Sequence, residues 1–72
     1  MITSMITEIG IAAGDIWHSL DKNGDAKLDQ LVQSIGKPKE LLLMSLGWLA
    51  REGHIKLSGP ESGYSASLNI NR

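Results

Sequence analysis

The chain has 72 residues, of which 42% are hydrophobic and 21% charged, with a net charge of −1 and no cysteine. A domain this short buries only about 60% of its unfolded surface, and the lack of cysteine excludes disulfides and thiolate metal sites. The near-neutral charge, without a polybasic run, argues against membrane-surface or strongly electrostatic nucleic-acid binding. No apolar run approaches the ~20 residues that cross a bilayer, and no cationic segment precedes the first apolar residues, so we expect a cytoplasmic protein.

The first predicted element is an amphipathic helix over residues 8–20. Its apolar residues recur at spacings of three and four: Ile9, Ala12, Ala13, Ile16, Trp17 and Leu20. We expect Thr7 to cap this helix and Trp17 to pack in the core. Gly10 and Gly14 each weaken the helix by roughly 1 kcal/mol relative to alanine. They also leave a bare strip on which another element could pack closely.

Residues 21–32, DKNGDAKLDQLV, begin like the calcium loop of an EF-hand. Its first three ligand positions hold Asp21, Asn23 and Asp25. The match then fails, because Ala26 stands where the sharp turn requires glycine and Val32 where a bidentate Glu should close the cage. We predict a tight Asx-type turn here and no metal site, with weak cation binding as the open alternative.

Two further helices follow, joined by a short turn. Apolar residues at i, i+3, i+4 and i+7 predict a helix over residues 28–35: Leu28, Leu31, Val32 and Ile35. Gly36 ends it, in a position where a positive φ costs little. Pro38 suits the first turn of a third helix, because its missing N–H would have no partner there. This helix, predicted over residues 38–52 and ended by Gly53, is the longest and most apolar element.

The hydrophobic period changes from helical to alternating after Gly53. HIKLS at residues 54–58 and YSASLNI at residues 64–70 alternate around the loop GPESG, which predicts a β-hairpin of two strands. Residues 26–27 can add a third, very short strand. The order of elements predicts an α+β fold, a winged helix-turn-helix with a wing hairpin, in one domain over residues 1–72.

Two tryptophan segments make this layout more specific. GDIWHSL lies in the first helix, and LGWLAREGHIKL leads from the third helix into the first wing strand. Both resemble a family of small stand-alone winged helix-turn-helix domains of bacteria and archaea, of unassigned function, and the similarity covers nearly the whole chain. The resemblance implies the fold and an association with regulation. It implies no ligand, since a fold does not fix a function.

The third helix carries the candidate binding surface. With Leu42, Leu46 and Leu49 directed inward, its other side presents a second apolar stripe, and a domain of this size has little other protein to cover it. Because exposed apolar patches mark interaction sites, we predict a protein interface, most simply that of a homodimer. Its residues are Leu41, Leu43, Met44, Gly47, Trp48 and Arg51. The alternatives are that Trp48 folds back onto the hairpin or that the surface also touches DNA.

A DNA-binding transcriptional regulator is the alternative function. In DNA-binding members of this fold the third helix enters the major groove, while Lys and Arg neutralise phosphates. The candidate nucleic-acid contacts are Lys37, Lys39, Ser45, Arg51 and Lys56. Glu40 and Glu52 offset these charges, and the wing tip carries Glu61 and no cation, so the support for DNA binding is weak.

The sequence contains no visible catalytic machinery. His18 and His54 stand alone, without neighbours at metal-ligand spacing or a nucleophile–base pair, and there is no glycine-rich phosphate loop. We therefore expect a non-enzymatic module of regulatory type that binds macromolecules and uses no cofactor, metal, membrane or small-molecule substrate.

Overall fold

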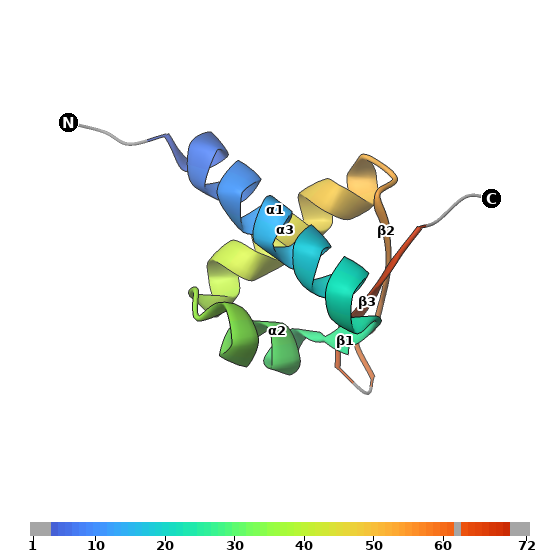
Figure 1. The fold of residues 1–72 in the computed structure, drawn as a ribbon. Coiled ribbons are helices and arrows are strands. Elements are labelled where there is room, and N and C mark those ends of the chain that lie inside the picture. The colour runs from blue at the N-terminus through green and yellow to red at the C-terminus, as the bar shows by residue number, and fades with distance from the viewer. Residues whose placement is uncertain (1–3, 62, 70–72) are drawn as a thin grey trace.

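The structure, a computed structural model, describes residues 4–61 and 63–69 as three helices and a small antiparallel sheet (Figure 1). The helices are α1 (Met5–Asn23), α2 (Leu28–Ile35) and α3 (Lys39–Arg51), and the strands are β1 (Ala26–Lys27), β2 (Ile55–Ser58) and β3 (Ser65–Leu68). The predicted α+β winged helix-turn-helix fold, with its third very short strand, is confirmed. Ile70, which we assigned to the second wing strand, lies outside the described residues.

α1 begins earlier than predicted. Its N-cap is Ser4, whose hydroxyl accepts a hydrogen bond from the N–H of Ile6 at 3.2 Å. The cap predicted at Thr7 is therefore wrong, because an equally good capping residue stands three positions upstream and the helix includes Thr7.

α1 also ends later than predicted. The N–H of Gly24 still donates to the carbonyl of Leu20, at 2.9 Å, so the helix runs through Asn23. Gly24 then leaves the helix with a φ of 86°, a conformation that glycine adopts without steric cost. The turn that we placed at Asp21 thus begins at Gly24, and Asp21 lies on a helix rather than in a calcium-type loop.

α2 and α3 form the helix-turn-helix. The side chain of Gln30 accepts a hydrogen bond from the N–H of Lys27 at 2.8 Å, which fixes the start of α2. Gly36 ends α2 in the left-handed conformation, and its N–H donates to the carbonyl of Val32 at 3.0 Å. Only residues 36–38 separate the two helices.

The sheet has the order β1-β3-β2, with both pairs antiparallel. Ala66 in the central strand pairs with Ala26 on one side and with Leu57 on the other. The hydroxyls of Ser58 and Ser65 lie 2.9 Å apart near the tip of the hairpin. This sheet closes one side of the core, because Ile55 and Ala66 are both buried.

The core fills the space between the three helices and the sheet, where α1 crosses α3 (Figure 1). Its members are Ala12, Ala13, Ile16, Leu20, Leu28, Leu31, Leu41, Leu42, Leu46, Leu49, Ile55 and Ala66. Ser45 is buried among them, with its hydroxyl 2.8 Å from the carbonyl oxygen of Leu41 and 3.2 Å from that of Ile9. The contact with Ile9 links α3 to α1.

Candidate protein-binding surface

One side of α3 faces away from the core and carries a regular pattern. Positions at spacings of four, three and four form a continuous line along a helix, and all four here are exposed: Glu40, Met44, Gly47 and Arg51. Leu43 and Trp48 flank this line on either side. We call these six residues the α3 seam. The buried leucines of α3 occupy the opposite side of the helix.

The apolar part of the α3 seam is open to solvent. Met44 is 44% exposed and Trp48 is 47% exposed, whereas Leu43 is half-buried against the edge of the core. Leu41 differs from its neighbours, because it is only 8% exposed and belongs to the core. The surface position predicted for Leu41 is therefore wrong.

Leu41 and Trp48 lie two turns apart on nearly the same side of α3, yet Leu41 is buried and Trp48 is exposed. This difference in burial has a physical cause. Near Leu41 the helix is drawn against α1 by the Ser45 hydroxyl, which reaches the carbonyl of Ile9. Near Trp48 the facing part of α1 carries Gly10 and Gly14, which add no side chain there, and Trp48 is 47% exposed.

The result is a shallow apolar groove of about 320 Å³ between α1 and the C-terminal part of α3. Its lining residues are Gly10, Ala13, Gly14, Trp17, Trp48, Leu49 and His54. A Cβ added at Gly10 or Gly14 would meet no heavy atom within 4 Å, so nothing in the described chain packs on this strip. We call this feature the tryptophan groove.

Trp17 forms a wall of the tryptophan groove and is 37% exposed. The prediction that it packs in the core is wrong, because consecutive helical positions point about 100° apart and the preceding Ile16 takes the core position. Sequence reasoning identified the glycine strip but missed the groove, since nothing in the sequence places Trp48 beside Gly10 and Gly14.

Each tryptophan contacts a histidine. The rings of Trp17 and His18 meet edge to face with centroids 5.7 Å apart, and those of Trp48 and His54 lie 6.2 Å apart at a tilt of 39°. His54 directly precedes β2, so Trp48 leans towards the wing without being covered by it. Within residues 4–61 and 63–69, no three His, Asp or Glu side chains gather as a metal site would require.

Two of the five predicted nucleic-acid contacts are paired or buried. The ammonium of Lys37 lies 3.4 Å from the carboxylate of Asp15, which partly neutralises it. Ser45 is fully buried and bonded to backbone carbonyls, so the prediction that it contacts a ligand is wrong. The remaining candidates are exposed, with Lys39 at the start of α3, Arg51 at its end and Lys56 on β2.

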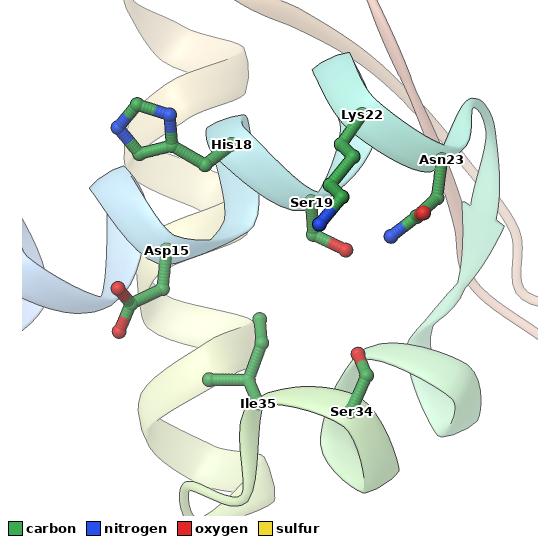
Figure 2. Close-up of a pocket in the computed structure, with 7 residues that line it drawn as sticks. All are labelled: Asp15, His18, Ser19, Lys22, Asn23, Ser34 and Ile35. Atoms are coloured by element: carbon green, nitrogen blue, oxygen red, sulfur yellow. The ribbon is translucent and has the colours of Figure 1, made fainter.

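A polar cleft of about 410 Å³ lies between α1 and α2. Figure 2 shows Ser19 and Lys22 of α1 across from Ser34 of α2, while the ring of His18 is turned away. Among the described residues, no buried side-chain polar atom lacks a hydrogen-bond partner. The cleft therefore offers solvated surface groups rather than a prearranged ligand site.

Two comparisons with known proteins bear on these features. Residues 1–67 match a family model described as "Winged helix-turn-helix domain (DUF2582)", and a search of curated proteins gave no match. The matched range includes all three helices and the first two strands. In the described part of the chain, no helix is both long enough and apolar enough to cross a membrane.

Proposed function

The chain belongs to the winged helix-turn-helix domain family DUF2582, and from this membership we propose that it is a non-enzymatic regulatory module of the cytoplasm that binds a protein through the α3 seam. Winged helix-turn-helix domains commonly bind nucleic acids or proteins and are generally not enzymes. The partner class is therefore decided by the chemistry of the exposed face of α3.

The observation that carries the proposal is the exposure of Met44 and Trp48 near the middle of α3. A helix that reads base edges presents Arg, Lys, Asn, Gln, Ser or Thr there. The one hydroxyl of α3, on Ser45, is buried, so the middle of the helix offers a base no hydroxyl, amide or charged side chain, and only the indole N–H of Trp48 as a donor. Methionine, tryptophan and arginine are instead enriched at the centres of protein interfaces.

The tryptophan groove supports the same conclusion. It brings Trp17, Gly10 and Gly14 of α1 together with Trp48 of the α3 seam. An aromatic-walled hollow of this kind receives an apolar anchor residue of a partner, and such anchors dominate the binding energy of many interfaces.

DNA binding has less support. Lys39 and Arg51 are separated by twelve residues, or about 18 Å of helix, with apolar side chains between them. With Lys56 they would neutralise about three phosphates, which predicts weak binding that ordinary salt abolishes.

A photo-cross-linking experiment tests the proposed function. We expect p-benzoylphenylalanine in place of Met44, in the full chain irradiated in cells, to form a covalent adduct with a protein that mass spectrometry maps to α3. The same group in place of Gln33, which is exposed on α2, is the matched control and should form no such adduct. An adduct at Met44 with nucleic acid alone, or no adduct at all, contradicts the proposal.

A further inference from the structure

We infer that the partner of the α3 seam is a second copy of this chain, with the two α3 helices antiparallel and Glu40 of each copy facing Arg51 of the other. This inference rests on the proposed function, because it names the protein that occupies the same surface.

The first support is the symmetry of the sequence pattern. The midpoint between Glu40 and Arg51 along α3 is also the midpoint between Met44 and Gly47, and all four residues lie on one line along the helix. When two copies of one helix pack antiparallel about a two-fold axis at that midpoint, the two members of each such pair face each other. A two-fold interface needs this self-complementarity, whereas a different partner would not require it.

The second support is charge. Glu40 and Arg51 are both exposed, and in the described part of the chain neither is paired with an opposite charge. The antiparallel arrangement joins them in two equivalent pairs at the two ends of the seam. A parallel arrangement would place Glu40 against Glu40 and Arg51 against Arg51, which repel each other, so the charges favour one orientation.

The third support is shape. At the centre of the seam, Met44 of one copy meets Gly47 of the other, so a flexible apolar side chain lies over a residue without one. A Cβ at Gly47 would meet no heavy atom within 4 Å in its own chain, so the hollow there is empty. On the flanks, the two-fold axis places Trp48 beside Trp48 of the other copy on one side of the seam and Leu43 beside Leu43 on the other, and all four side chains are apolar.

The free edge of the sheet is a less suitable place for self-association. β2 pairs only with β3 in the described sheet, so its outer edge is open. That edge is four residues long and carries Lys56, and a short edge with a lysine resists pairing with a second strand.

Charge exchange tests the inference. At hundreds of micromolar, light scattering of the wild-type chain should give a mass approaching twice 7.8 kDa. Glu40→Arg and Arg51→Glu should each weaken the dimer about tenfold, because each substitution replaces two attractive contacts by two repulsive ones. The double variant Glu40→Arg/Arg51→Glu should restore the wild-type dissociation constant, with circular dichroism confirming that every variant is folded.

The outcomes separate this inference from the proposed function. A wild-type chain that stays monomeric at these concentrations overturns the inference, whatever the variants do. A dimer that the double variant fails to restore overturns the antiparallel arrangement. If the chain is monomeric while the photo-cross-linker at Met44 captures a different protein, the proposed function stands and only self-association is removed.

Discussion

At the scale of the residue, two apolar side chains one turn apart on α3 have different structural roles. Leu41 is 8% exposed and packs in the core, and Met44, three residues later, is 44% exposed on the α3 seam. Both looked alike in the sequence, as members of one apolar stripe. Their burial implies that a charge at the first position damages folding, while a charge at the second damages binding.

We therefore expect opposite consequences from Leu41→Glu and Met44→Glu. Leu41→Glu should cost about 3 kcal/mol or more, since it removes core packing and buries a carboxylate. That is a large part of the roughly 4–11 kcal/mol expected for a domain of this length. Met44→Glu should change the free energy of unfolding by about 0.5 kcal/mol or less, as surface substitutions do, and yet abolish dimerisation.

Thermal melting followed by circular dichroism measures the first effect and light scattering the second. A folded, monomeric Leu41→Glu variant would show that Leu41 belongs to the interface, as the sequence alone suggested. If Met44→Glu failed to fold, Met44 would belong to the core and not to the exposed surface.

The sequence could not identify the role of Ser45. A hydroxyl in the third helix of this fold resembles a DNA contact, but serine in a helix can also bond the carbonyl four residues earlier and so be buried at little cost. Ser45 does this with Leu41, at 2.8 Å. The choice between the two roles depends on the packing of α1 against α3, which no local pattern contains.

At the scale of the element, α3 contains a glycine in its interior that the fold does not need. Gly47 is exposed and helical, and the space around its missing side chain is empty. Glycine at such a position costs a helix up to about 1 kcal/mol relative to good helix formers. A place in the proposed interface, where Met44 of the second copy would approach, accounts for it.

We expect Gly47→Gln to change folding and assembly in opposite directions. The free energy of unfolding of the dilute monomer should rise by about 0.7 kcal/mol, which raises Tm by roughly 3–6 °C in a domain of this size. The dimer should weaken, because the new side chain fills the hollow that Met44 occupies. Thr7→Gln is the control, since it also introduces a better helix former at an exposed position of α1 outside the seam and the groove, and it should leave dimerisation unchanged.

Melting at low protein concentration and light scattering at high concentration provide the two readings. A Gly47→Gln variant that dimerises as strongly as the wild type would place Gly47 outside the interface.

Element boundaries were predictable where local chemistry was unambiguous. α2 coincides with the predicted range of residues 28–35, because its apolar spacing is regular and Gly36 ends it in a conformation suited to glycine. α1 was predicted three residues short at each end. At the start of α1, Ser4 rather than Thr7 caps the helix. At its end, the hydrogen bond from Gly24 to Leu20 keeps the turn-forming residues after Leu20 in the helix.

At the scale of the whole molecule, the proposed binding surface is assembled from distant parts of the chain. The tryptophan groove joins Gly14 and Trp17 of α1 to Trp48 of α3 and to His54 before the wing. The sequence predicted the fold and the apolar stripe on α3, because both follow from periodicity. It could not predict the groove, which depends on how α1 crosses α3.

The same arrangement leaves the cations of the chain dispersed. Lys37 is engaged by Asp15, and Lys39 and Arg51 lie at opposite ends of α3. This placement of Arg51 supports the proposed pairing with a carboxylate at one end of a helix pair more than the reading of DNA.

Disulfide trapping tests the antiparallel helix pair most directly, because the chain has no cysteine of its own. In that arrangement, Glu40 of one copy lies opposite Arg51 of the other, while the two Glu40 residues are about 16 Å apart along the helices. A disulfide requires Cα atoms within about 7 Å. Under mild oxidation, Glu40→Cys and Arg51→Cys should each remain uncross-linked alone, and an equimolar mixture of the two should yield a covalent dimer of unlike chains. Efficient cross-linking of Glu40→Cys by itself, or no cross-linking in the mixture, would contradict the antiparallel pairing of α3.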